Sequence, residues 1–347
     1  MIKEAIRKVS QKKHLTFQEA KDVFYEIFDE KASNSQVASF LTGLSILGEE
    51  ENEIAAAATV VREKAIRIYP RERNIKGQSN DEPIIDTCGT GGSGVSKFNI
   101  STAVSFVVSS AGVKVAKHGN RAVSSRSGSA DVFEVLGIKI DVSPRVMEQS
   151  IKEIGIGFLF APLYHKAFKS VALVRKDIGI RTIFNIIGPL CNPAFVSHQL
   201  LGVSDEKLLR IAALALNKMG IESAFVVYGD TLKDEITLTG KTKVIYLHGG
   251  GIEELDLMPS NFGLKECSAK DLEADTPEQS ASIILDIFNA KKSPARDVVL
   301  ANAAACFYIL GMAGNLKAGV SLAEQLIDTG KVKNKYYIFK DFIGKNG

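Results

Sequence analysis

The segment GTGGSG at residues 89–94 offers several backbone amides that no large side chain shields. An apolar run precedes it, and NIST at residues 99–102 follows it at the start of an expected helix. Backbone amides at a turn and at a helix N-terminus together favour an anion such as phosphate. The segment fits neither the GxGxxG pattern nor the GxxxxGK[ST] loop, so it predicts a phosphate site of another kind. The alternative is a turn that only links a strand to a helix.

A second polar segment, KHGNR at residues 117–121, follows an apolar run at residues 113–116 and leads into hydroxyl-rich residues 124–131. Open parallel sheets place ligands at the carboxyl ends of their strands. Cations and hydroxyls at such an end suit a second phosphate group. A solvated basic loop is the alternative for this segment taken alone.

Two further groups carry charge. Arg175 or Arg181 could bind a carboxylate through both guanidinium nitrogens, although a lone arginine or histidine on a helix more often packs or faces solvent. The apolar loop at residues 182–193 contains Gly-Pro and Asn-Pro and is suited to form a pocket wall.

The adjacent Asp234 and Glu235 are of the type that binds Mg²⁺ together with substrate phosphates, although an acidic pair alone is more often solvated.

The composition bounds the class of protein. The chain has 347 residues, 45% of them hydrophobic, and a formal net charge of +3, which argues against nucleic acid or a membrane surface as its main partner. Its four cysteines lie far apart without CxxC spacing, so we expect neither a zinc site nor a disulfide framework. No apolar run resembles a signal peptide or a membrane span, and we therefore expect a cytoplasmic protein.

The elements that must position these residues fall into two regions. Apolar residues recur at helical spacing over residues 2–69, with helix starts expected at Thr16, which has Glu19 three residues on, and at Asn34. Residues 70–83 are polar and glycine-containing and predict a linker. The first region is thus an all-helical one.

Beyond the linker, short apolar runs alternate with helical stretches, which predicts a largely parallel sheet. Residues 236–257 alternate around glycine turns and predict an antiparallel excursion. From residue 277 onward the chain is mainly helical, with a run of small residues at 301–305 suited to close packing. The expected strands are residues 83–86, 113–116, 157–160, 199–203 and 224–227, and the expected helices between them are 101–111, 130–136, 144–154 and 206–219. The fold class is α/β, with a small N-terminal all-helical domain and a larger α/β domain.

Taken in order, GTGG, FNIST, KHGNR, SSRSGSADV, RTIFNIIGPLCNPA and the Asp-Glu pair resemble the anthranilate phosphoribosyltransferases over nearly the whole chain. The resemblance implies a helical domain at residues 1–70, joined by a helical segment near 165–190, and an α/β domain at 71–347. It further implies an active site at the hinge, a homodimer formed through the helical domains, and two substrates, anthranilate and phosphoribosyl pyrophosphate. Tryptophan biosynthesis is the implied pathway.

The resemblance also assigns residues to three sites, and it implies no side-chain nucleophile or general base. Two Mg²⁺ ions are implied, one at Ser101 and the other at Asp234 and Glu235. Anthranilate is assigned to Gly89, His118, Asn120, His165 and Arg175. Phosphoribosyl pyrophosphate is assigned to Gly89, Gly92, Ser93, Lys97, Asn99, Ser101, Thr102, Lys117, Ser125 and Ser129.

Two positions depart from the pattern that the resemblance implies, because Ser93 stands where an Asp is usual and Lys97 where Thr or Ser is usual. The first change removes an acceptor near the metal, and the second adds a cation. Two other functions are alternatives. A pyrimidine nucleoside phosphorylase would lack KHGNR followed by GPLxNPA, and a non-catalytic nucleic-acid-binding relative should show a broad basic surface and degraded substrate motifs.

Overall fold

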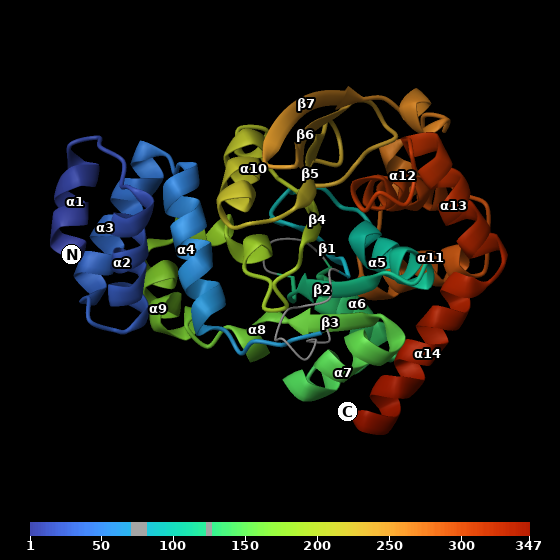
Figure 1. The fold of residues 1–347 in the computed structure, drawn as a ribbon, viewed down its shortest axis with the longest axis horizontal. Coiled ribbons are helices and arrows are strands. Elements are labelled where there is room, and N and C mark those ends of the chain that lie inside the picture. The colour runs from blue at the N-terminus through green and yellow to red at the C-terminus, as the bar shows by residue number, and fades with distance from the viewer. Residues whose placement is uncertain (71–81, 123–126) are drawn as a thin grey trace.

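The computed structural model describes residues 1–70, 82–122 and 127–347. Four N-terminal helices lie together at one end of the molecule (Figure 1). They are α1 (Ile2–Ser10), α2 (Phe17–Phe28), α3 (Asn34–Leu47) and α4 (Glu51–Lys64). Most of the linker expected at residues 70–83 lies outside the described residues.

The starts of α2 and α3 are set by capping boxes. The Thr16 hydroxyl accepts a hydrogen bond from the Glu19 backbone N–H, while the Glu19 carboxylate accepts one from the Thr16 N–H, which confirms the expected start of α2. The expected cap at Asn34 is wrong by one residue. Ser33 is the cap because its hydroxyl accepts from the Gln36 N–H, and Asn34 is already the first helical residue.

A fifth helix, α9 (Phe168–Ile178), packs against α2 and α3 although it follows the third strand in the chain (Figure 1). Contacts between aromatic rings stabilise this packing. Phe28 contacts both Phe168 and Phe184 edge-on, and Phe24 contacts Phe184 in the same way. Edge-to-face ring pairs add to the stabilisation that burial of their apolar area gives.

One seven-stranded sheet forms the centre of the rest of the chain, in the order β3-β2-β1-β4-β5-β6-β7. The first five strands are parallel, and the last two are antiparallel to their neighbours, as expected from the sequence. The order runs outward from β1 in both directions, so the switch point lies between β1 and β4. The strands are β1 (Ile84–Gly89), β2 (Lys114–Gly119), β3 (Ile156–Phe160), β4 (His198–Gly202), β5 (Ser223–Gly229), β6 (Thr242–His248) and β7 (Gly251–Leu257).

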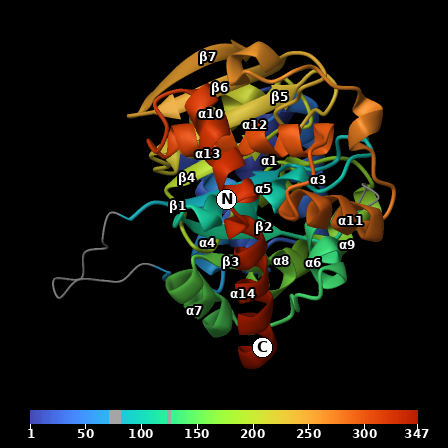
Figure 2. The same ribbon diagram turned by 90° about the vertical axis from the view of Figure 1, so that its right-hand side faces the viewer.

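Nine helices, besides short 3-10 turns, accompany this sheet within the described residues. Helix α5 packs on β1 and β2, α12 on β4 and β5, and α7 on β2 and β3, while α14 crosses the front of the view in Figure 2. Gly319 of α13 permits the close approach of α12, since an added Cβ would lie 2.8 Å from the Ala304 Cα. The helices are α5 (Ile100–Ser110), α6 (Ser129–Val135), α7 (Pro144–Ile154), α8 (Ala161–Tyr164), α10 (Leu208–Lys218), α11 (Pro277–Phe288), α12 (Pro294–Ile309), α13 (Leu316–Asp328) and α14 (Lys331–Asn346).

These elements confirm the predicted fold class of a helical domain followed by an α/β domain with a mainly parallel sheet. The division at residue 70 stays a prediction. Within the described part of the chain, no helix combines the length and the apolar character needed to cross a membrane.

Candidate active site

The glycine-rich loop follows β1 at the switch point of the sheet, where parallel α/β sheets bind ligands. Its shape needs glycine, because Gly91, Gly92 and Gly94 have φ values of 64°, 71° and 70°. The loop is tied to β4, since the Thr90 N–H donates to the Gly202 carbonyl at 2.9 Å. The loop thus leads from the switch point to the N-terminus of α5.

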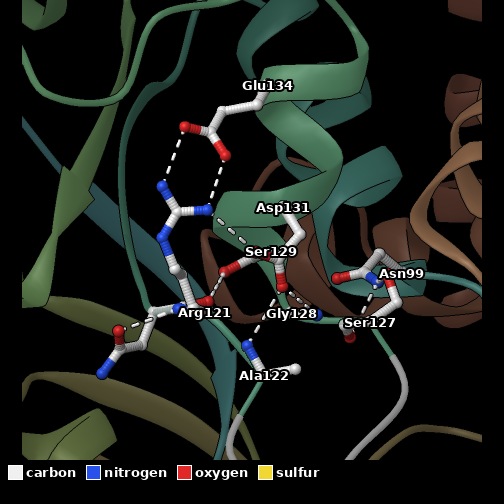
Figure 3. Close-up of polar contacts among 9 residues, drawn as sticks. Asn99, Arg121, Ala122, Ser127, Gly128, Ser129, Asp131 and Glu134 are labelled. Atoms are coloured by element: carbon white, nitrogen blue, oxygen red, sulfur yellow. Dashed lines mark hydrogen bonds and ion pairs between the residues drawn. The ribbon is translucent and has the colours of Figure 1, made fainter.

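Asn99 joins this loop to the second polar segment (Figure 3). It is the N-cap residue of α5, and its side-chain amide donates to the Ser127 carbonyl at 3.3 Å and to the Ser127 hydroxyl at 3.1 Å. Its backbone N–H donates to the Ser280 hydroxyl. The loops predicted to hold two phosphate groups therefore lie next to each other.

Arg121 of the second segment is fully engaged by acids. Its guanidinium contacts both carboxylate oxygens of Glu134, at 2.6 and 2.9 Å, and Asp131 at 3.1 Å (Figure 3). The hydrogen bonds that Arg121 donates, first to Glu134 and then to Asp131, raise its pKa. Arg121 therefore stabilises the local fold instead of offering a free cation to a phosphate.

The other side chains assigned to the two loops are placed as follows. Asn120 is exposed and its side-chain oxygen accepts from the Arg121 N–H at 2.8 Å, while the Ser129 hydroxyl donates to the Asn120 carbonyl at 3.4 Å. The Ser93 hydroxyl accepts from the Val95 N–H at 3.5 Å. Thr102 is buried, and its hydroxyl lacks a hydrogen-bond partner. Ser125 lies outside the described residues.

Lys117 is a buried cation at the centre of the site, with 1% of its surface exposed. Its ammonium donates to the Thr87 carbonyl at 2.6 Å and to the Ser101 hydroxyl at 3.0 Å. Burial lowers the pKa of Lys117, and the nearby Asp86 acts against that shift. Lys117 of strand β2 thus places a positive charge at the first turn of α5. The positive end of the helix dipole would also stabilise an anion there.

Asp86 is a buried carboxylate to which the sequence assigned no role. It accepts hydrogen bonds from the His118 N–H at 3.1 Å, from the Asn192 side chain at 2.8 Å and from the Cys88 thiol at 3.2 Å. Burial raises its pKa, while Lys117 and these hydrogen bonds oppose the rise. Asp86 thereby fixes β1, β2 and the apolar loop at one point. An acid inside an apolar strand was the signal that could have revealed it.

A second lysine, Lys97, reaches across to the acidic pair. Its ammonium lies 2.5 Å from the Asp234 carboxylate and 2.7 Å from the Leu232 carbonyl, to which it donates. Glu235 instead points to the start of α5, where the Ser101 backbone N–H donates to it. Burial raises the pKa of Glu235 to about 7, and the positive charge of Lys97 acts against that rise.

The predicted metal ligands divide into two unlike groups. Across residues 1–70, 82–122 and 127–347, no three His, Cys, Asp or Glu side chains converge as a metal site. The Ser101 hydroxyl and the Glu235 carboxylate are hard oxygen donors that suit one Mg²⁺ completed by water and substrate oxygens. Asp234 differs because its carboxylate forms an ion pair with Lys97, whereas the Ser101 hydroxyl accepts a single hydrogen bond from Lys117 and keeps a second lone pair.

Two histidines meet between β2 and the start of the helical connection to α9. The Nε2 atoms of His118 and His165 lie 3.1 Å apart, and both side chains are buried. Burial lowers the pKa of His118 well below its ordinary value and that of His165 to about 4, so both rings are neutral at pH 7. The His165 Nδ1 and the neighbouring Tyr164 hydroxyl are buried without a hydrogen-bond partner.

Arg175 lies on α9 with its guanidinium 5.4 Å from the centre of the Phe184 ring. It is partly buried, which lowers its pKa, and no acidic side chain of the described residues pairs with it. Arg181, the other candidate, is exposed and donates to the Ser204 hydroxyl at 3.1 Å. Arg175 is thus the better placed of the two to receive a substrate carboxylate.

Comparison with known proteins defines the class first. Residues 3–65 match the helical bundle domain of a glycosyl transferase family, and residues 81–333 match the α/β domain of that family. Among similar proteins, the anthranilate phosphoribosyltransferase of Acetivibrio thermocellus is 44% identical over 342 residues, which cover 99% of this chain and 96% of the relative. That of Clostridium kluyveri is 46% identical over 336 residues, covering 97% and 98%.

Solved structures agree. The anthranilate phosphoribosyltransferase of Thermus thermophilus matches with a TM-score of 0.89 and 36% identity, covering 98% of this chain and 99% of that one. The Saccharomyces cerevisiae enzyme in complex with phosphoribosyl pyrophosphate and Mg matches with a TM-score of 0.86 and 27% identity, covering 99% and 98%. This chain belongs to the anthranilate phosphoribosyltransferase family.

Proposed function

We propose that the chain transfers the phosphoribosyl group of phosphoribosyl pyrophosphate to the amine of anthranilate, with release of pyrophosphate, in tryptophan biosynthesis. One observation carries the proposal at this site: the glycine loop, buried Lys117 and Ser101 meet at the switch point, with Glu235 beside them. Full-length relatives with 44% to 46% identity support the same reaction.

The proposed pyrophosphate site comprises the amides of the glycine loop, Lys117 and the N-terminus of α5. Its other proposed members, Asn99, Ser129 and Ser125, belong to the second loop or contact it. The anthranilate carboxylate is assigned to Arg175 and Asn120, and the paired rings of His118 and His165 line the path to the ribose. Neutral histidines suit that role because they do not compete with Arg175 for the carboxylate.

The reaction needs positioning more than an activated side chain. An aromatic amine is already a nucleophile, so no general base is required, and the site must align the amine with the anomeric carbon while it stabilises the departing pyrophosphate. Alignment of two bound reactants can supply roughly 7–11 kcal/mol of the barrier. Lys117 and the loop amides face the developing negative charge, and closure of the helical domain excludes water.

Mg²⁺ is the proposed cofactor, and when bound it would supply positive charge to the pyrophosphate oxygens. Ser101 and Glu235 are its ligands in this proposal, which includes one ion because Asp234, expected with Glu235 to hold a second ion, already pairs with the Lys97 ammonium. The yeast relative, whose structure holds phosphoribosyl pyrophosphate and Mg, supports this choice. A cytoplasmic homodimer that associates through the helical domains completes the proposal.

The test follows the fluorescence of anthranilate as it is consumed, with and without phosphoribosyl pyrophosphate and Mg²⁺. We expect Arg175→Ala to raise the KM for anthranilate roughly tenfold to a hundredfold with a smaller change in kcat. A hydrogen bond to a charged group contributes about 1.5–3 kcal/mol.

Arg145→Ala removes an exposed arginine on α7 and is the matched control, for which we expect an unchanged KM. A wild-type chain that consumes no anthranilate, but cleaves a pyrimidine nucleoside with phosphate or shifts nucleic acid in a gel, would overturn the assignment. An Arg175→Ala variant with wild-type kinetics would remove the assigned role of this residue alone.

A further inference from the structure

The ammonium of Lys97 lies beside Asp234, the residue at which a second metal ion is expected. It lies 2.5 Å from one carboxylate oxygen of Asp234, and both side chains are 11% exposed. The other Asp234 oxygen faces the end of β1, 2.9 Å from where a Cβ on Gly89 would lie. A divalent ion on this carboxylate would therefore sit against a fixed positive charge.

Two hydrogen bonds hold Lys97 in this place. The ammonium donates to the Leu232 carbonyl at 2.7 Å as well as to Asp234. An ammonium has three donors, so one N–H is left for a substrate oxygen. The anchoring resembles that of Lys117, which also spends two donors on protein oxygens, Thr87 and Ser101.

The surrounding charges favour an ammonium over a second divalent ion. The loop at residues 89–94 contributes a hydroxyl at Ser93 and no carboxylate. Asp234 has its cation, and Glu235 faces Ser101 on the other side. Of this acidic pair, Glu235 is therefore the residue whose carboxylate is not paired with a cation within the described residues. The pair thus offers a carboxylate to one divalent ion.

We infer that Lys97 serves as a built-in second cation of the active site, so that the chain binds phosphoribosyl pyrophosphate with one divalent ion and the Lys97 ammonium. The inference rests on the proposed function, because it assigns roles at the same site. Lys97 then acts as a pyrophosphate-binding residue that Asp234 positions. The predicted second Mg²⁺ at Asp234 is replaced by this ammonium.

The first experiment counts metal ions without turnover. Mn²⁺ is titrated into the chain with substoichiometric phosphoribosyl pyrophosphate and no anthranilate, and bound Mn²⁺ is measured by electron paramagnetic resonance. We expect one tightly bound ion per complex in the wild type and two in the Ser93→Asp/Lys97→Thr double variant. Two ions of equal affinity in the wild type would overturn the inference.

The second experiment measures the affinity for phosphoribosyl pyrophosphate by calorimetry at fixed Mg²⁺. We expect Lys97→Met to weaken binding at least tenfold, Lys97→Arg to stay within about threefold, and Lys333→Met, at an exposed position on α14, to match the wild type. Thermal unfolding identifies any variant that has lost its fold. Binding by folded Lys97→Met that equals the wild type contradicts the inference.

These outcomes are separate from failure of the proposed function. A chain that consumes anthranilate with phosphoribosyl pyrophosphate and yet binds two Mn²⁺ ions retains the function and loses the inference. A chain that binds no phosphoribosyl pyrophosphate at any metal concentration loses both.

Discussion

His118 and His165 share a buried contact in which neither ring carries a charge. Their nearest nitrogens are 3.1 Å apart, and a proton on both rings would place two positive charges in a buried position. Burial lowers both pKa values, to about 4 for His165. In the unfolded chain a histidine titrates near pH 6.5, so the folded state resists a proton that the unfolded state accepts.

We therefore expect the free energy of unfolding to fall as the pH drops from about 6.5 toward 4. Above pH 6.5 the histidines are neutral in the folded and in the unfolded chain, so protonation does not reduce the free energy of unfolding. Across the window the unfolded chain binds more protons, and His165 alone accounts for a loss of up to about 3 kcal/mol. Urea unfolding at pH 7.5, 5.5 and 4.5 measures this dependence.

His165→Asn should flatten the pH dependence, while His248→Asn, at an exposed position on β6, should leave it unchanged. Carboxylates contribute alike to all three proteins, so the difference between them reports His165 together with its effect on the pKa of His118. Parallel curves for the wild type and His165→Asn would show that the pair does not resist protonation.

At the scale of elements, the end of β4 is pressed against the acidic loop at residues 230–235. A Cβ on Gly202 would lie 1.8 Å from the Asp234 carbonyl oxygen, and one on Gly89 would lie 2.9 Å from a carboxylate oxygen of the same residue. The clash at Gly202 would be with a backbone atom, so rotation of a side chain could not relieve it. Glycine at these strand ends thus lets the acidic loop close over the switch point.

We expect Gly202→Ala to destabilise the protein by at least about 2 kcal/mol, because overpacking against a fixed backbone costs that much or more. Gly314→Ala is the matched control, since nothing lies within 4 Å of its added Cβ. Denaturant midpoints of the two variants give the comparison. Equal midpoints would mean that the loop can shift without loss.

Several elements could be predicted from the sequence because their cause is local. The strand predicted at residues 224–227 is the centre of β5 (Ser223–Gly229), and the helix predicted at 144–154 is α7 itself. Short buried apolar runs and capping residues determine both. The run predicted at 83–86 is longer in the structure, since β1 continues through Asp86 to Gly89. The polar residues in the second half of β1 interrupt the apolar run, so the sequence did not predict that the strand continues. In the folded chain, tertiary hydrogen bonds satisfy these polar groups.

The site could be predicted only in part, for a physical reason. The glycine loop and the helix start after it are adjacent in the chain, so their pattern indicates an anion site. The contact of Lys97 with Asp234 spans 137 residues and that of Asn192 with Asp86 spans 106, and no local pattern encodes them. The sheet order alone brings these partners together.

At the scale of the whole molecule, apolar side chains remain exposed on the helical end. Ile46 of α3 is 81% exposed, Leu173 of α9 is 58% exposed, and Ile180 just beyond α9 is 47% exposed. Exposed apolar residues on neighbouring helices are typical of protein interfaces. They support the proposed dimer through the helical domains.

We expect Ile46→Asp with Leu173→Asp to shift the protein from dimer to monomer, with a dissociation constant raised at least about a hundredfold. Tyr337→Asp changes an exposed side chain on α14, at the other end of the molecule (Figure 1), and should leave the mass unchanged. Analytical ultracentrifugation over a concentration series measures the masses. A wild-type monomer at all concentrations would refute the dimer.

The position of α9 in the chain affects how the protein is made. On the ribosome, α1 to α4 emerge first, whereas α9, which packs on α2 and α3, follows only after β1, β2 and β3 have been synthesised. Until then the rings of Phe24 and Phe28 lack their partners Phe168 and Phe184. The nascent N-terminal helices therefore expose aromatic rings during translation. The helical domain is completed only by a segment about 100 residues further along the chain. At ordinary elongation rates, synthesis of the intervening residues takes roughly 5–20 s.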